Sequence, residues 1–214
     1  RQPDWPNAFQ SVGFPLWDPA FEPRLPEKIE QFLGDGSPPI VFVPGSANAQ
    51  AGEFFRVAAE VCRHLRVRAV FATRFPAQLP DVLPPGVIHA DFVPFSLLLP
   101  RAKALVHHGG IGSSAQALAT ATPQLIMPMA YDQLDNAERL RRLGVADYLS
   151  PRRFIADRVE ARLEKLLART DVDQRCKELA ERCDGAASLD QAAAAIERLV
   201  RLRETPRPGR VGAP

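Results

Sequence analysis

The stretch from Ala104 to Ala119 most constrains the fold of this 214-residue chain. An apolar run over residues 104–106 ends in His107 and His108. Three glycines and two serines then precede a helix-forming segment. This order predicts a strand, a tight glycine loop and the start of a helix. Such a junction presents backbone N–H groups and the positive end of a helix dipole, which favours a phosphate or a diphosphate.

Short apolar runs alternate with helical patterns on both sides of this junction. The run Ile40–Val43 is entirely apolar and bounded by prolines, as expected of a strand covered on both faces of a parallel sheet. The alternation predicts an α/β fold with a Rossmann-like, doubly wound parallel sheet, helices on both faces and a helical C-terminus. Strands are expected over 40–43, 69–72, 87–90, 104–107, 124–127 and 145–148, and helices over 25–33, 50–65, 95–102, 113–120, 134–143, 155–168, 172–183 and 188–203.

The chain is predicted to have three parts. Residues 1–26 hold six prolines and several aromatic side chains, which favours an extended interdomain segment packed on the domain. Residues 27–203 form the folded domain. Residues 204–214 are rich in Pro, Gly and Arg and are expected to be a disordered tail. Because the chain opens with Arg1 and an irregular segment, we expect it to begin inside a longer protein.

The charge balance gives no sign of a nucleic-acid partner. The chain has 27 basic and 25 acidic residues, a formal net charge of +2. It contains no apolar run of membrane-spanning length and no signal peptide. Its three cysteines lack the spacing of a metal site or a redox pair. These features predict a cytoplasmic protein.

Ligands of a parallel α/β sheet bind beyond the carboxyl ends of its strands, so the residues that follow each predicted strand are the candidate site. These residues are polar, aromatic or glycine-rich, and they should converge on one edge of the sheet. They include Ser46 after the first strand, Phe92 and Val93 after the third, the glycine loop after the fourth, and Asp132 and Gln133 after the fifth.

The glycine loop has both a structural and a functional interpretation. It is either a plain turn or a phosphate site, and its three glycines, two histidines and two hydroxyls favour the latter. His108 would donate to a phosphate oxygen or bond to backbone at the strand end, whereas His107 is assigned a structural role. Ser113 is either the N-cap of the following helix or a phosphate ligand.

The other loops are open to two interpretations as well. Asp132 is a helix N-cap, or it joins Gln133 in binding vicinal sugar hydroxyls. Phe92 stacks on a base or belongs to the core. No metal motif is visible near the loop. A departing diphosphate would therefore be stabilised by helix N–H groups, the helix dipole, and His108 or Ser113.

A dinucleotide fingerprint is a competing interpretation. Gly110-x-Gly112-x-x-Ala115 fits the pattern G-x-G-x-x-G/A, and Asp132 follows about twenty residues later. That fingerprint belongs to the first βα unit, however, whereas three strands are predicted before this loop. Four residues also separate Asp132 from its strand. A nicotinamide-dependent oxidoreductase is therefore the weaker alternative.

The motifs between Phe92 and Ala137 together resemble the nucleotide-sugar signature of GT-B glycosyltransferases of the UDP-glycosyltransferase-like class. That signature has an aromatic-x-Pro, a His-x-Gly loop with a small hydroxyl residue, two further prolines, and Asp-Gln-x-x-Asn-Ala. Two earlier segments are similar to bacterial sterol glucosyltransferases and lipid rhamnosyltransferases. The matching residues are Phe92–Pro94, His108–Ser113, Pro123, Pro128 and Asp132–Ala137, with Gly13–Leu16 and Val41–Ser46 as the earlier segments.

The resemblance implies a role for each matching residue. The nucleoside would contact Phe92 and Val93, and Gln116, which replaces the ribose-binding Glu of plant relatives. The donor sugar would bind to Asp132 and Gln133. The diphosphate would contact Ser46, His108, Gly110, Gly112 and Ser113.

The resemblance also implies a function. Residues 27–203 would be the donor-binding half of a GT-B fold, from an inverting, metal-independent glycosyltransferase that uses no cofactor. The parent would transfer a hexose from a UDP-sugar or dTDP-sugar to a hydroxyl of a small or lipid acceptor. The catalytic base is expected in an N-terminal acceptor-binding domain, so this chain alone should bind donor without turnover. A stand-alone donor-binding subunit, and peripheral membrane association of the full-length protein, remain open.

Overall fold

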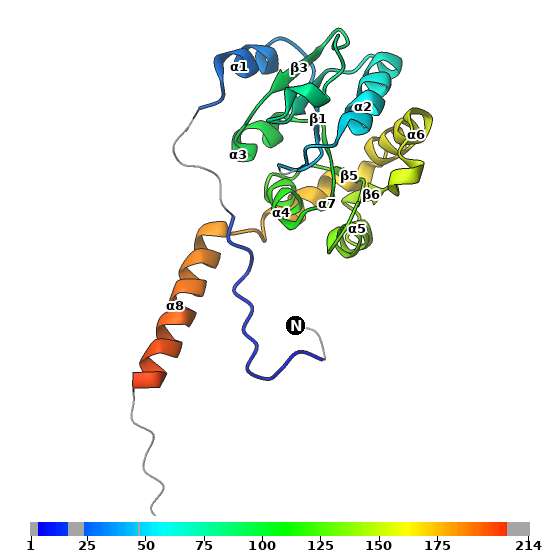
Figure 1. Ribbon diagram of the computed structural model, residues 1–214. Coiled ribbons are helices and arrows are strands. Elements are labelled where there is room, and N and C mark those ends of the chain that lie inside the picture. The colour runs from blue at the N-terminus through cyan, green and yellow to red at the C-terminus, as the bar shows by residue number, and fades with distance from the viewer. Residues whose placement is uncertain (1–3, 17–23, 47, 205–214) are drawn as a thin grey trace, which may run out of the picture. The chain divides into compact units, whose positions relative to one another are not determined.

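The computed structural model describes residues 4–16, 24–46 and 48–204 (Figure 1). The chain divides into two compact units. Residues 18–182 form one unit, which contains the sheet. Residues 1–17 and 183–214 form the other.

Parallel strands in the order β3-β2-β1-β4-β5-β6 form the sheet. This is the doubly wound arrangement, and the predicted fold class is confirmed. The strand order reverses between β1 and β4, where Val43 lies opposite His107. The loops that leave these two strands are therefore neighbours. The strands are β1 (Ile40–Val43), β2 (Ala69–Ala72), β3 (Val87–Ala90), β4 (Ala104–His107), β5 (Gln124–Ile126) and β6 (Ala146–Tyr148).

Most helices lie within a few residues of their predicted bounds. The predicted single helix over 95–102 is wrong. Its α-helical part ends at Leu98 and a 3-10 turn follows, because Pro100 has no N–H for an α-helical hydrogen bond. The elements are α1 (Glu27–Gly34), α2 (Gly52–Leu65), η1 (Pro76–Gln78), α3 (Phe95–Leu98), η2 (Leu99–Arg101), α4 (Ile111–Ala119), α5 (Gln133–Arg142), η3 (Pro151–Arg153), α6 (Ala156–Leu167), α7 (Thr170–Ala180) and α8 (Gly185–Glu204).

The two faces of the sheet are covered by different helices, because successive side chains of a strand point to opposite faces. On one face, Phe42 and Phe71 pack against α2 and α6. On the other, Val41 and Leu105 pack against α1, α3 and α4 (Figure 1). A third cluster around Ile126 packs with α5 and α7. Each of these fully buried large side chains contributes roughly 1.5–3 kcal/mol to folding.

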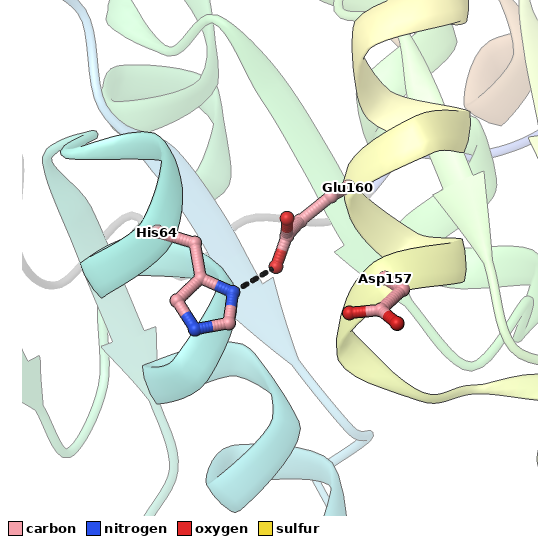
Figure 2. A group of neighbouring side chains, drawn as sticks. All are labelled: His64, Asp157 and Glu160. Atoms are coloured by element: carbon pink, nitrogen blue, oxygen red, sulfur yellow. Dashed lines mark hydrogen bonds and ion pairs between the residues drawn. The ribbon is translucent and has the colours of Figure 1, made fainter.

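A polar contact joins α2 and α6 outside the core. His64, in the last turn of α2, donates from Nδ1 to Glu160 Oε1 at 2.7 Å, and Asp157 lies beside them (Figure 2). Because α2 starts at the carboxyl edge of the sheet and runs back, this contact lies toward the opposite edge.

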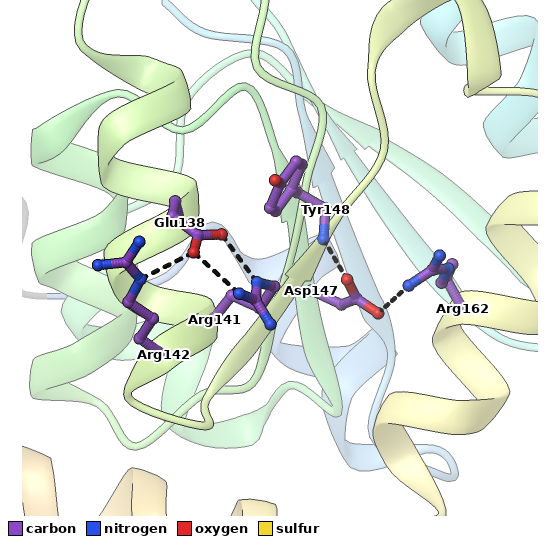
Figure 3. A network of polar contacts seen from close by, with 6 residues as sticks. All are labelled: Glu138, Arg141, Arg142, Asp147, Tyr148 and Arg162. Atoms are coloured by element: carbon purple, nitrogen blue, oxygen red, sulfur yellow. Dashed lines mark hydrogen bonds and ion pairs between the residues drawn. The ribbon is translucent and has the colours of Figure 1, made fainter.

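Charged side chains also stabilise the end of the sheet at β6. Arg162 of α6 donates to Asp147 at 2.6 Å, and the other oxygen of Asp147 accepts from the Tyr148 backbone (Figure 3). On α5, Glu138 accepts hydrogen bonds from Arg141 and Arg142. These two guanidinium groups, Arg141 first, lower the pKa of Glu138 to about 2.

The second unit combines α8 with the first residues of the chain. Residues 4–16 contain neither helix nor strand, and Arg198 of α8 donates to Gln10 at 3.2 Å. Residues 17–23, in the predicted linker, and 205–214, in the predicted tail, lie outside the described residues. None of the described helices has the length and the apolar character needed to cross a bilayer.

Candidate functional site

The loops after β1, β4 and β5 come together at the carboxyl edge of the sheet. Asn48, in the loop after β1, donates to the sulfur of Met129, in the loop after β5, at 3.7 Å. The backbone of Gly45 approaches the ring of His108 so closely that a Cβ there would lie 3.0 Å from Cε1. The predicted convergence of these loops is therefore present in the structure.

His107 is a structural residue, as predicted. It is fully buried, donates from Nε2 to Gln124 Oε1 at 3.0 Å, and accepts at Nδ1 from the Gly109 N–H at 3.2 Å. Burial lowers the pKa of His107 to about 3, and the neighbouring His108 adds to this effect. The imidazole is neutral at physiological pH and fixes the first turn of the glycine loop.

His108 lies between two glycines. A Cβ at Gly110 would lie 2.4 Å from Nε2 of this ring, so the ring leaves no space for one. At Gly45 a Cβ would make a tight contact of 3.0 Å, and the φ of +110° strains any other residue. The Nδ1 atom of His108 is buried and has no hydrogen-bond partner among the described residues. The predicted alternative, a hydrogen bond from this atom to the backbone at the strand end, is therefore absent. His107 makes a backbone hydrogen bond there, with the Gly109 N–H. Burial lowers the pKa of His108, while the carboxylate of Asp132 opposes that shift.

The first turn of α4 presents unpaired N–H groups toward the site. Gly110 is the N-cap and no side chain caps this helix end, so the prediction of Ser113 as N-cap is wrong. Helix geometry leaves the N–H groups of Ile111, Gly112 and Ser113 without intrahelical acceptors. A Cβ on Gly112 would meet nothing within 4 Å. The fold itself therefore does not require glycine here, whereas close approach of a ligand would.

Asp132 and Gln133 begin α5 at the rim of the site. Asp132 occupies the N-cap position but makes no capping hydrogen bond, and its exposed carboxylate accepts from Asn136 at 2.7 Å. Gln133 Oε1 accepts from the N–H groups of Met129 and Ala130 at 2.8 and 3.1 Å. The carboxamide oxygen of Gln133 thus shapes its own loop, and its Nε2 group is the part that can reach a ligand.

Two residues that hold the loops together were given no role from the sequence, although Asn136 belongs to the motif Asp132–Ala137. Asn136 donates both to the Gly109 carbonyl at 3.0 Å and to Asp132. Gln78 is buried, accepts from the Ala51 N–H at 3.0 Å and donates to the Asn48 carbonyl at 2.8 Å. The spacing of Asp132 and Asn136, four residues apart on a helix, is the signal that would have linked that pair.

The remaining predicted ligands have different surroundings. Phe92 is 46% exposed beyond β3, so its assignment to the core is wrong, while a stacking surface stays available. Val93 is buried in the core, which leaves only its backbone for a ligand. Gln116 is buried on α4, and Ser46 is exposed on the turn after Gly45.

Possible metal ligands gather elsewhere in the described part of the chain. His64, Asp157 and Glu160 have potential ligand atoms within 4.8 Å of one another. Glu160 is already engaged with His64, and these residues belong to α2 and α6 and not to the three loops.

The position of the glycine loop also weakens the dinucleotide interpretation. The loop follows β4, the fourth strand of the chain, whereas the dinucleotide fingerprint occupies the first βα turn. Asp132 lies at the start of α5 and not at the end of a strand, where a ribose-binding acid would stand.

Comparison with protein families gives a match over most of the chain. The family model described as "Erythromycin biosynthesis protein CIII-like, C-terminal domain" matches residues 56–199. This match includes the glycine loop, Asp132 and Asn136.

Individual proteins are similar over an even larger part of the chain. This chain is 30% identical over 206 residues to O-mycaminosyltylonolide 6-deoxyallosyltransferase of Streptomyces fradiae. The alignment covers 94% of this chain and 47% of that protein. The calicheamicin glycosyltransferase CalG4 superposes with a TM-score of 0.66 at 25% identity, over 92% of this chain and 47% of that one. The glycotransferase of kitacinnamycin superposes with a TM-score of 0.68 at 27% identity, over 77% of this chain and 44% of that one. The chain thus spans about half the length of these relatives.

Proposed function

Because the chain belongs to the family of the erythromycin biosynthesis protein CIII-like C-terminal domain, we propose that it is the nucleotide-sugar-binding part of a glycosyltransferase. The observation that carries the proposal is the joining of three loops at one edge of the sheet. There the uncapped start of α4, the partly buried ring of His108 and the carboxylate of Asp132 lie together.

The geometry supports a distinct role for each group. The N–H groups of α4 and the imidazole of His108 would bind the donor diphosphate, since a helix start attracts anions. Asp132 and the Nε2 group of Gln133 would bind sugar hydroxyls, and exposed Phe92 would stack on the nucleobase. Ser46 would meet the diphosphate from the facing loop.

The proposed reaction is an inverting transfer. An acceptor hydroxyl attacks the anomeric carbon in line as a base removes its proton, and the nucleoside diphosphate departs. The N–H groups and His108 stabilise the charge on the leaving group, without a metal in this scheme. Since the relatives include a 6-deoxyallosyltransferase acting on a named small molecule, we place the acceptor of the parent among small molecules with a free hydroxyl.

The acceptor half and the catalytic base are proposed to lie in an N-terminal domain of the parent. Four apolar side chains of α8 are half exposed or more, which supports a further surface packing on this helix: Leu189, Ile196, Leu199 and Val200. The isolated chain should accordingly bind donor and not transfer sugar. Transfer activity of this chain with donor and several small acceptors would contradict that division of labour.

Calorimetry provides the direct test. Uridine diphosphate, thymidine diphosphate and NAD are titrated into the chain, and one of the two diphosphates should bind while NAD should not. His108→Ala should weaken diphosphate binding by about 1–3 kcal/mol, the cost of losing a buried or charge-assisted hydrogen bond. His64→Ala, which changes a half-exposed histidine on the seam between α2 and α6, is the matched control and should not change the affinity. Binding of NAD alone would overturn the proposal.

A further inference from the structure

We infer that Asn136 is a positioning residue that fixes the diphosphate loop and the sugar-binding carboxylate as one unit. This inference rests on the proposed function and deepens it. The side chain of Asn136 lies in the first turn of α5, and its two hydrogen bonds reach two different loops.

The geometry uses the whole donor capacity of the amide. An NH₂ group has two hydrogens, and those of Asn136 go to the Gly109 carbonyl at 3.0 Å and to Asp132 Oδ2 at 2.7 Å. The planar amide therefore fixes the distance between the glycine loop and the carboxylate. It also leaves Oδ1 of Asp132 as the oxygen for a sugar hydroxyl.

The Gly109 end of this link is itself rigid. Gly109 has φ of +88°, and a Cβ there would lie 2.8 Å from Ile126 Cγ2, so other residues are excluded. Its N–H donates to the buried ring of His107. Asn136 thus anchors Asp132 to a fixed backbone point next to His108.

The chemistry of the two partners requires asparagine. Both the Gly109 carbonyl and the Asp132 carboxylate are acceptors, so an aspartate at position 136 would face them with a third acceptor. Two carboxylates so close repel each other unless one takes up a proton. A leucine has a similar size and offers no donor at all.

Binding measurements on the full 214-residue chain test the inference. Wild type, Asn136→Leu and Asn136→Asp are titrated with the nucleoside diphosphate that binds and with its glucose conjugate. Asn136→Leu should lose about tenfold more affinity for the conjugate than for the free diphosphate, roughly the effect of one buried hydrogen bond. Asp135→Asn, an exposed change one residue earlier on α5, is the control and should leave both affinities unchanged.

The pH response of Asn136→Asp separates positioning from a merely structural role. Its affinity for the conjugate, relative to wild type, should recover as the pH falls from 8 to 5, because a proton shared by the two carboxyls restores a donor. If both variants lower the melting temperature and weaken both ligands by the same factor at every pH, Asn136 is only structural and the inference fails. If wild type binds neither diphosphate, the proposed function itself fails.

Discussion

At the scale of single residues, small and neutral groups define the glycine loop around His107 and His108. Glycines at positions 45 and 110 make room for the ring of His108, and burial keeps His107 uncharged. Tyr131 stands out because it combines a left-handed backbone, with φ of +56°, and 95% exposure beside Asp132. A left-handed backbone is unfavourable for a bulky residue, and a side chain this exposed makes too few contacts to offset that conformational free energy.

Gly112 offers a test of whether a ligand occupies the start of α4. Gly112→Ala should leave the fold intact and raise the free energy of unfolding by up to about 1 kcal/mol, since Ala is the better helix former. It should nevertheless weaken diphosphate binding at least tenfold, because the methyl group would meet the incoming phosphate. Calorimetry and urea unfolding measure the two effects.

The matched control is Gly34→Ala at the end of α1. A Cβ there also meets nothing within 4 Å, and the position is on a helix away from the three loops. Unchanged affinity in both variants would show that no ligand approaches Gly112.

The buried ring of His107 should make the fold less stable at acidic pH. Its folded-state pKa of about 3 lies below the ordinary value of 6.5, so folding favours the neutral ring. The corresponding stability is complete above pH 6.5 and is lost as the pH falls toward 3. Between pH 7 and pH 4.5 wild type should lose about 2–3 kcal/mol of unfolding free energy from this group.

His107→Asn keeps an acceptor for the Gly109 N–H and cannot titrate in this range. The variant should be less stable at pH 7, yet its stability should fall less on acidification. Urea unfolding at the two pH values gives the comparison, and parallel losses in both proteins would disprove the assignment.

At the scale of elements, the helices on the two faces of the sheet have different tasks. The seam of α2 and α6 is built from buried apolar side chains and has the His64–Glu160 contact at its margin. The elements α4 and α5 carry the residues of the proposed site in their first turns, at the carboxyl edge of the sheet. The seam of α2 and α6 thus mainly stabilises the fold, whereas the first turns of α4 and α5 provide the proposed ligand contacts.

The last helix gives a prediction at this scale. If the exposed apolar side chains of α8 pack on the acceptor half, then Ile196→Asp combined with Leu199→Asp should lower the melting temperature and transfer rate of the full-length parent. Neither residue belongs to the donor site. The same double variant in the 214-residue chain should therefore keep its diphosphate affinity. An unaltered parent enzyme would show that α8 is free of such an interface.

At the scale of the whole molecule, the sequence alone was enough to predict the sheet and most of its helices. Runs such as Ile40–Val43 are short, apolar and bounded by prolines, so their strand character is local information. The links between loops could not be predicted, because they join residues far apart in the chain. Asn136 reaches back to Gly109, and Gln78 to Asn48, through side-chain hydrogen bonds that no local pattern reveals.

The backbone of Gly109 makes one hydrogen bond with His107 and one with Asn136. This has a consequence for how relatives of this chain can diverge. An insertion in the loop after β4 or β5 would break the link through Asn136 and displace both halves of the site at once. Substitutions at the exposed tips, such as Phe92 and Tyr131, leave that link untouched. New donor preferences should therefore arise, in nature or in directed evolution, by exchange of tip side chains at constant loop length.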